Sequence, residues 1–436
     1  MVADYARPVL GDRGLDADRA HYGGPSRPRI VLLLGTYVMP DRTPAALRAL
    51  GLAAALREAG YQCSFGAGEF WSEGAWCPEG FRSVVNQFPV ESLAELGGPR
   101  TSRWRRAKAL LFSVGSSARR WLASQDLSQV AAVISTGGYS PLMLRLLPFL
   151  HRRGIPLVVD IADWYDPWHL PGGPFAPPCW QVELAMRVLH KRCDGVIAVS
   201  SLLQNYYEAP SRPTVRIPPT TDTSHRKWTE ALNLVLRADS ELRLVYAGTP
   251  GKKDDLRMVV EAARKAQHAC GRIRLTIVGP TRDACRSELP AGLRADLDGL
   301  EVRFPGFVNH EAVPRLLAES DFFVLVRPKR RYSDAGFPTK LVESLCSGVP
   351  MIVNATSDIP DYVHDGEEGF IVPGYSADGL AATLVRAAAT LPEKRLEMRR
   401  AARIRAERSF DNRVYAETLG RLISHVRARI STRRAS

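Results

Sequence analysis

The sequence predicts an α/β protein built from two doubly wound parallel sheets, each in a domain of its own. Short apolar runs that end near glycine alternate with helical patterns, which is the order expected when helices cover both faces of a parallel sheet. The alternation stops at a polar stretch, 219–241, and then restarts. A chain of 436 residues is too long for one ordinary core, so the interruption is expected to separate two domains.

The first domain is predicted over 29–222. Its opening strand is the apolar run RIVLLLGTY at 29–37, and a helical pattern follows at 45–60 and ends at Gly60. Further strands are predicted in the runs VAAVISTGG, IPLVVDIAD and CDGVIAVS. Because helical segments lie between these strands, the strands are expected to be parallel.

The second domain is predicted over 242–405, after a linker over 223–241. Its strands are expected in the runs LRLVYAG, IRLTIVGP, LEVRFPGFV, DFFVLVRP, VPMIVNA and GFIVP. Two such domains joined by a hinge imply a cleft between them. Ligands would bind at the carboxyl ends of the strands that face this cleft.

Composition narrows the class of protein and its partners. Residues 1–28 are polar and lack the apolar run of a signal peptide, so we expect a disordered leader. The seven cysteines are scattered, which indicates reduced thiols in a cytoplasmic protein and no zinc site. The formal net charge of +13 favours an anionic partner, either phosphorylated substrates, a membrane surface or nucleic acid. Nucleic acid has no supporting motif, and we expect no binding of it.

The stretch GFPTKLVE at 336–343 is the predicted anion-binding segment. Pro338 suits the start of a helix, whose free N–H groups and partial positive charge favour phosphate. Thr339 and Glu343 are four apart and share a helical face, with Lys340 alongside. Glu343 lies roughly 6–8 Å along the helix from its start, which is about the distance from a diphosphate to its ribose. A carboxylate can accept hydrogen bonds from both ribose hydroxyls, so the segment predicts a nucleoside-diphosphate clamp; the alternative is a plain surface glutamate.

The loop YAGTPGKKDDL at 246–256 is a second candidate phosphate contact. Gly248 ends a strand, and glycines allow backbone N–H groups to approach an anion. Lys252 and Lys253 are mobile charges suited to phosphate. The alternative is a solvated basic turn.

The strand ends of the first domain supply the other side of the expected cleft. Gly35 ends the opening strand and is a candidate substrate contact. Asp163 follows another strand and is itself followed by Trp164 and Tyr165. Asp163 could hydrogen-bond a ligand in the cleft, and the two rings could stack on that ligand; the alternative is a helix-capping aspartate with packing aromatics.

The order of segments over 29–420 resembles family 4 glycosyltransferases, which have the GT-B fold. The motifs that carry the resemblance are LVYAGTPGKKDDL, LTIVGP, VRFPGFVNHEAVPRLLAESDFFVLV, GFPTKLVESLCSGVPMIV, DIPDYVHDGEEGFIV, CDGVIAVSSLLQNYY and VRIPPTTD. The resemblance implies a retaining transferase that moves a hexosyl group from a nucleotide-diphospho-sugar to a hydroxyl of a glycan, lipid-linked or small-molecule acceptor. Cell-surface polysaccharide or glycoconjugate biosynthesis is the implied setting, with no metal and no further cofactor. In this fold the terminal helix, here 406–436, packs back on the first domain.

By position, the resemblance makes Glu343 the ribose ligand and Lys253, or Lys252, the diphosphate ligand. Backbone around Phe307 and Val308 would hold the base. The sugar and phosphates would meet the turn formed by Phe337, Pro338, Thr339 and Lys340.

The family's usual pair of glutamates is incomplete in this chain. Ala335 stands where the first would be, eight positions before Glu343. The neighbouring Asp334 is the candidate replacement, and with Asp163 and Lys253 it makes up the predicted catalytic set. Two other functions stay open. A sugar-nucleotide 2-epimerase would need acid/base carboxylates and histidines that the matching segments lack. Ala335 keeps open the alternative of a non-catalytic partner subunit.

Residues 100–120 hold seven basic residues and no acidic one. Trp104, Leu111 and Val114 can share one face of a helix there, which is typical of a basic amphipathic helix on an anionic membrane. The alternative is a basic surface helix whose apolar stripe faces the core. We therefore expect a cytoplasmic protein that can lie at the inner face of the cell membrane.

Overall fold

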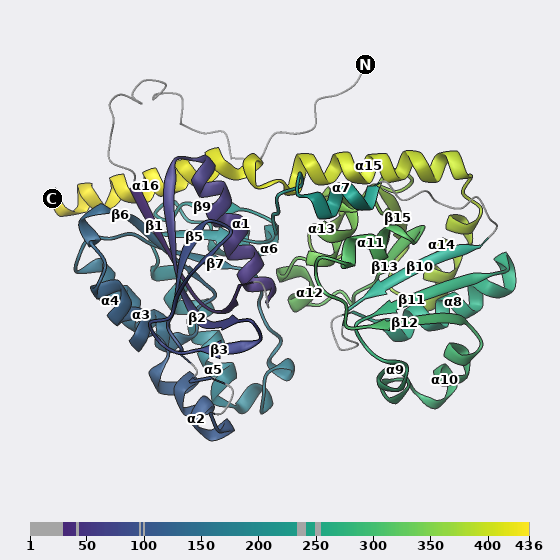
Figure 1. Cartoon of the computed structure of the whole chain (residues 1–436), viewed down its shortest axis with the longest axis horizontal. Helices are drawn as coiled ribbons and strands as arrows, with labels where there is room; N and C mark the ends of the chain where they lie inside the picture. The colour runs from purple at the N-terminus through teal and green to yellow at the C-terminus, as the bar shows by residue number, and fades with distance from the viewer. Residues whose placement is uncertain are drawn as a thin grey trace, which may run out of the picture.

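The computed structural model describes residues 29–40, 43–95, 97–98, 101–232, 241–248 and 254–435. They form two α/β domains side by side, with two long C-terminal helices running along one side of both (Figure 1). The predicted leader over 1–28, part of the predicted linker, and the loop with Lys252 and Lys253 lie outside the described residues.

The first domain contains a nine-stranded sheet in the order β4-β5-β2-β1-β6-β7-β8-β9, with β3 added to β2. The pairs β2–β3 and β4–β5 are antiparallel, and the other neighbours are parallel. The strands are β1 (Arg29–Met39), β2 (Tyr61–Ser72), β3 (Ala75–Cys77), β4 (Arg82–Val85), β5 (Phe88–Ser92), β6 (Val130–Thr136), β7 (Leu157–Ile161), β8 (Gly195–Ala198) and β9 (Thr214–Arg216). The direction of winding reverses between β1 and β6.

Helices cover both faces of this sheet, because successive residues of its strands point to opposite sides. Val31 and Leu33 of β1 join the core beneath α1, whereas Leu32 and Leu34 join the core beneath α3 and α4. The helical elements of the domain are α1 (Pro44–Glu58), α2 (Arg103–Lys108), η1 (Ala109–Ser113), α3 (Ser116–Ala123), η2 (Leu127–Gln129), α4 (Ser140–His151), η3 (Pro167–His169), η4 (Gly173–Phe175), α5 (Pro177–Leu184), η5 (Ala185–Leu189), η6 (His190–Arg192) and α6 (Ser201–Tyr207).

The expected amphipathic helix over 100–120 is interrupted. Gly115, with φ +96°, separates η1 from α3. Trp104 is 86% exposed and Val114 is fully buried, so the two do not share a face, which corrects that expectation. Among the described residues, no helix is both long and apolar enough to cross a membrane.

The second domain contains a six-stranded parallel sheet in the order β12-β11-β10-β13-β14-β15. Its strands are β10 (Leu242–Ala247), β11 (Ile273–Val278), β12 (Glu301–Gly306), β13 (Phe322–Leu325), β14 (Met351–Asn354) and β15 (Gly369–Val372). Its helical elements are α7 (Arg226–Leu232), α8 (Leu256–Cys270), α9 (Arg282–Glu288), α10 (Ala291–Asp298), α11 (Val313–Ala318), α12 (Arg331–Ala335), α13 (Thr339–Cys346), η7 (Ile359–Asp361) and α14 (Ala377–Ala388). Helix α7 lies within the predicted linker and packs on α11.

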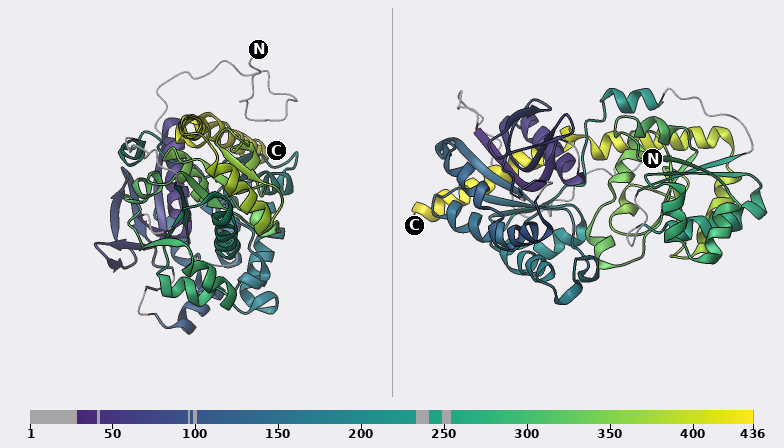
Figure 2. Two further views of the ribbon diagram at one scale, coloured as in Figure 1. Left: turned by 90° about the vertical axis from the view of Figure 1, so that its right-hand side faces the viewer. Right: turned by 60° about the horizontal axis from the view of Figure 1, so that its bottom comes forward.

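The C-terminal helices α15 (Pro392–Phe410) and α16 (Ala416–Ala435), joined by η8 (Asn412–Tyr415), serve different domains (Figure 2). Helix α15 packs on α13 of the second domain. Helix α16 packs on α1, and its buried residues belong to the core of the first domain. The chain therefore crosses between domains at Asp411, after the predicted position of 406, because Phe410 is still buried at the end of α15.

Candidate active site

Three glycines lie along the carboxyl edge of the second sheet, where β10, β11 and β12 end. Gly248 N donates to Val278 O at 3.0 Å, and Gly279 N donates to Gly306 O at 2.9 Å, so the three loops lie in one row. A Cβ on Gly279, whose φ is +117°, would lie 3.0 Å from the Gly248 carbonyl oxygen. The edge is therefore bare backbone, which a ligand can approach closely.

The predicted base-binding stretch continues this edge directly after Gly306. Val308 is half-buried and packs against the large apolar core. Phe307 is 90% exposed. The stretch thus has one residue anchored in the protein and an aromatic ring in solvent beside the glycine row.

Arg327 is a buried cation at this edge that the sequence analysis missed. It follows β13, and the strand order reverses between β10 and β13, which is where open α/β sheets bind ligands. Its Nε donates to Asp254 Oδ1 at 2.7 Å. The Asn354 amide holds its backbone N–H and C=O, at 2.9 and 2.7 Å. Asp254 lies beside Gly248, so the Arg327–Asp254 pair places a fixed cation and its counter-charge next to the glycine row.

Helix α13 carries the predicted ribose ligand. It begins at Thr339 after Pro338, and no side chain caps its first turn. Glu343 is 9% exposed, and its Oε2 accepts a hydrogen bond from Lys340 Nζ at 2.8 Å. The carboxylate is therefore held in place by a neighbour that could itself move to a phosphate.

The side chain of Phe337 lies in the core. It is 8% exposed, and its ring centroid lies 5.3 Å from that of Tyr362 and 6.0 Å from that of Phe410. The ring therefore anchors the turn into α13. The half-buried Thr339 and Lys340 and the backbone of the turn are then the groups that could contact a sugar.

Asp334 and Ala335 both make structural contacts. Asp334 Oδ1 accepts the N–H of Ser357 at 2.9 Å, and Ser357 has a left-handed φ of 51°, which is uncommon outside glycine. Ala335 is fully buried, and its carbonyl accepts from Ser200 Oγ of the first domain at 2.8 Å. The position of the missing glutamate is thus at the domain junction, and Asp334 holds the loop after β14.

Asp163 meets the second domain across the junction. A Cβ on Gly336 would lie 3.2 Å from Asp163 Oδ1, and Gly336 precedes the turn into α13. Tyr165 is 45% exposed beside it; burial, followed by the charge of Asp163, raises the pKa of Tyr165 to about 12. The structure therefore brings together Asp163 and the predicted phosphate-facing turn, which are far apart in the sequence.

Two other groups at the first sheet's edge are internal. Asp160 is fully buried and pairs with Arg48, whose Nε and Nη2 lie 2.9 and 2.7 Å from Asp160 Oδ1. Gly35 is buried, and a Cβ there would lie 2.3 Å from the Tyr37 ring and 3.0 Å from the Thr136 carbonyl oxygen. Gly35 is therefore closely packed, with no room for a side chain, and its contact with a substrate stays a prediction.

Polar contacts across the junction hold the two edges face to face. Arg331 of α12 lies with its guanidinium 4.7 Å from the Trp164 ring centroid and 3.4 Å from Glu183 Oε1. Arg216 pairs with Asp358 at 2.9 Å. The Ser200–Ala335 bond described above adds a direct link between the domains.

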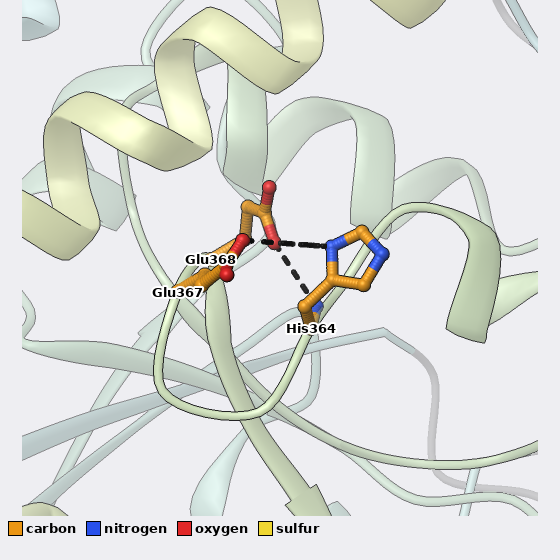
Figure 3. A group of neighbouring side chains, drawn as sticks. All are labelled: His364, Glu367 and Glu368. Carbon is orange, nitrogen blue, oxygen red and sulfur yellow. Dashed lines mark hydrogen bonds and ion pairs between the residues drawn. The ribbon is translucent and has the colours of Figure 1, made fainter. Parts of the chain in front are cut away.

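A cluster of His364, Glu367 and Glu368 has the side-chain types of a metal site (Figure 3). Glu368 Oε2 accepts from the backbone N–H of His364 at 3.0 Å and lies 3.0 Å from His364 Nδ1. Its other oxygen accepts from Arg405 Nε at 2.9 Å. Because the arginine already supplies a cation, the cluster is best described as an ion pair that ties α15 to the loop before β15.

Comparison with known proteins identifies the family. Residues 45–220 match a model described as glycosyl transferase 4-like domain, and residues 241–390 match one described as glycosyl transferases group 1. The putative colanic acid biosynthesis glycosyltransferase WcaL of Salmonella typhimurium is 30% identical over 146 residues, which are 33% of this chain and 35% of that protein. The amylovoran biosynthesis glycosyltransferase AmsK of Erwinia amylovora is 31% identical over 166 residues, which are 36% of this chain and 39% of that protein. The chain thus spans well under half the length of these two relatives.

The fold has solved counterparts. The crystal structure of Anabaena HepE in complex with UDP and glucose aligns with a TM-score of 0.60 at 15% identity, over 91% of this chain and 100% of that one. At this identity the likeness concerns the fold alone, which is the two-domain GT-B fold. With both halves matched by glycosyltransferase models, the chain belongs to the family 4 glycosyltransferases.

Proposed function

We propose that the protein is a retaining glycosyltransferase that moves a hexosyl group from a nucleotide-diphospho-sugar to a hydroxyl group of a glycan or lipid-linked acceptor. The observation that carries the proposal is the meeting of the two strand edges, where Asp163 of the first domain lies against Gly336 at the start of the α13 turn. The relatives named for colanic acid and amylovoran biosynthesis support a role in making a polysaccharide. The UDP and glucose bound to HepE support a UDP-sugar as the first donor to try.

In the proposed donor complex the diphosphate lies along the glycine row, beside the start of α13. Helix N–H groups and the Arg327 guanidinium stabilise its charge, together with Lys252 and Lys253. Glu343 accepts hydrogen bonds from the ribose. Lys340, which pairs with Glu343 at 2.8 Å when no ligand is bound, turns toward the phosphates and releases the carboxylate oxygen.

The proposed transfer breaks the bond between the anomeric carbon and the diphosphate oxygen, and the diphosphate leaves with the electron pair. The acceptor oxygen attacks the anomeric carbon from the face that the diphosphate leaves, and its proton passes to a phosphate oxygen. The cations act by stabilising the charge that develops on the leaving group. Asp163 positions a hydroxyl of the sugar or acceptor, and Asp334 keeps its bond to Ser357. Because these groups supply the electrostatic stabilisation, the transfer is expected to persist in EDTA.

Release of nucleoside diphosphate tests the proposal, with UDP- and GDP-sugars offered with and without acceptor glycans and glycolipids. Acceptor-dependent release, with the anomeric configuration retained in the product by NMR, is the expected result. Interconversion of the donor sugar without acceptor would instead identify a 2-epimerase. Donor binding without turnover across the acceptor panel would favour a non-catalytic partner subunit.

A further inference from the structure

Large apolar side chains are exposed on one part of the first domain. They belong to α2, η1, η3, η4, α5 and η5, and the residues are Trp104, Phe112, Trp168, Phe175, Trp180, Leu184 and Val188, here called the aromatic face. Neighbouring elements of this group contact one another, η1 with both α2 and α5, and η4 with both η3 and α5. Helices α2 and α5 lie at the same end of the domain (Figure 1). In the described residues, the exposed aromatic side chains outside 104–180 are Phe307 and Tyr375.

The part of this face on α5 and η5 is a regular stripe. Trp180, Leu184 and Val188 are spaced four apart, so they lie along one side of the helical segment, and they are 60%, 41% and 38% exposed. The opposite side of the segment is held in the core by Met186, whose carbonyl accepts from the Tyr207 hydroxyl at 2.6 Å. The stripe is therefore fixed in its orientation toward solvent. Contiguous exposed apolar surface of this kind marks an interaction site.

The same region carries a large share of the positive charge. Residues 101–192 contain twelve lysines and arginines against five aspartates and glutamates, within a chain of net charge +13. Two of those acids are already matched, since Asp160 pairs with Arg48 and Glu183 pairs with Arg187. Arg105 and Lys108, which lie three residues apart on the helix that presents Trp104, are exposed. The stretch that carries the aromatic face therefore has seven more cations than acids, and Arg105 and Lys108 place two of these cations on the helix that presents Trp104.

We propose that the aromatic face docks the protein on the surface of an anionic lipid bilayer. Tryptophan rings and aliphatic side chains insert at the level of the headgroups, and nearby lysines and arginines are drawn to anionic lipids. The positive surplus decides between this occupant and a second copy of the chain, because two such faces would repel each other. The docking itself does not depend on the proposed transfer.

The docked orientation also bears on the acceptor. Trp168 follows Asp163 and Tyr165 in the same loop, so the aromatic face is continuous in sequence with the first domain's side of the candidate active site. If the proposed transfer holds, that side would face the lipid headgroups. An acceptor carried on a lipid would then reach Asp163 without leaving the membrane.

Flotation with vesicles of phosphatidylcholine, with and without phosphatidylglycerol, tests the docking in the full-length protein without donor or acceptor. We expect binding to the anionic vesicles that falls at least about tenfold in the triple variant Trp180→Ser, Leu184→Ser, Val188→Ser. A matched triple variant replaces by serine three exposed apolar residues of the second domain, Leu391, Leu396 and Ile404, and should bind like the wild type. Arg105→Gln combined with Lys108→Gln should weaken binding by roughly tenfold or more, at about 1 kcal/mol for each charge. Thermal denaturation checks that each variant is folded.

Three results would overturn the proposal. The first is absence of wild-type binding to anionic vesicles, and the second is equal binding by the Trp180 triple variant. The third is a wild-type dimer in sedimentation equilibrium that the same variant converts to a monomer, because the face would then be covered by a second copy. Since none of these measurements uses a donor, their failure is separate from failure of the proposed transfer.

Discussion

Replacing Glu343 with glutamine probes the ribose-binding role, because the side chain keeps its shape and loses its charge. Glu343 is 9% exposed and lies one turn into α13, with Lys340 Nζ at 2.8 Å from its Oε2. In the proposed complex both of its oxygens accept hydrogen bonds from the ribose hydroxyls. Glutamine retains one oxygen acceptor and presents N–H groups at the other position.

The expected loss follows from the strength of such bonds. A hydrogen bond to a charged group contributes about 1.5–3 kcal/mol, and one to a neutral group about 0.5–1.5 kcal/mol. Releasing Lys340 already costs the wild type part of this gain, so we expect Glu343→Gln to lose about 2 kcal/mol of binding free energy, roughly thirtyfold in Kd. Uridine and UDP should lose affinity by the same factor, since both carry the ribose.

Isothermal titration calorimetry with UDP and with uridine measures both values. Glu367→Gln is the matched control, because Glu367 is a glutamate of the same domain that lies outside α13 and has 68% of its side chain exposed. Thermal denaturation establishes that the two variants are folded. The ribose role is refuted if folded Glu343→Gln binds UDP within about threefold of the wild type, or if Glu367→Gln loses as much affinity.

Four further changes test other parts of the molecule. Arg327→Gln should weaken UDP binding about tenfold or more and leave uridine binding nearly unchanged in calorimetry, because in the proposed complex the lost charge lies beside the diphosphate; an equal effect on uridine would contradict this. Asp160→Asn should lower the free energy of unfolding by about 3–5 kcal/mol in urea, since it leaves Arg48 buried without its charged partner. Burial lowers the pKa of His190 to about 4, below the value of about 6.5 in an unfolded chain. The unfolded state then binds the proton more tightly, so stability should decline as the pH falls from about 6.5 to about 4, and less steeply in His190→Gln. EDTA should leave nucleoside diphosphate release unchanged, and loss of activity that Mg²⁺ or Mn²⁺ restores would show that a metal takes part.

The central strands could be predicted from the sequence because a strand buried on both faces is a continuous apolar run. The runs beginning at 29, 130 and 242 became β1, β6 and β10. The stretch 61–92 carried no predicted strand, yet it forms β2 to β5. Strands β3, β4 and β5 lie toward the edge of the sheet, and β3 and β4 are partly exposed, so their sequences lack the apolar run that marks the centre. Strand β2 is paired on both sides and largely buried, but glycine and polar residues interrupt its apolar run.

Some features of the candidate site could be predicted from one short segment, whereas others depend on contacts between distant segments. The position of Glu343 on α13 follows from helix spacing within one short segment, and so does its pairing with Lys340. Asp163 and Gly336 belong to different domains, and their contact cannot be predicted from the spacing of residues within either segment. The position of Arg327 at the end of a strand could have been predicted from the sequence, because the arginine directly follows an apolar run. Its importance became evident only from the strand order, which places β13 beside β10.

In the helical segment 177–189, the periodicity of the sequence does not predict which side is buried. This segment carries part of the surface in the membrane proposal. Trp180, Leu184 and Val188 have the spacing that ordinarily marks a core-facing stripe, yet they are exposed. The core instead receives Cys179, Met186 and Leu189. Both sets of residues satisfy a helical period, and contacts with α4 and with Tyr207 decide which one is buried. Periodicity thus predicts that the exposed stripe needs an apolar partner, and the surrounding positive charge makes an anionic bilayer the partner to test.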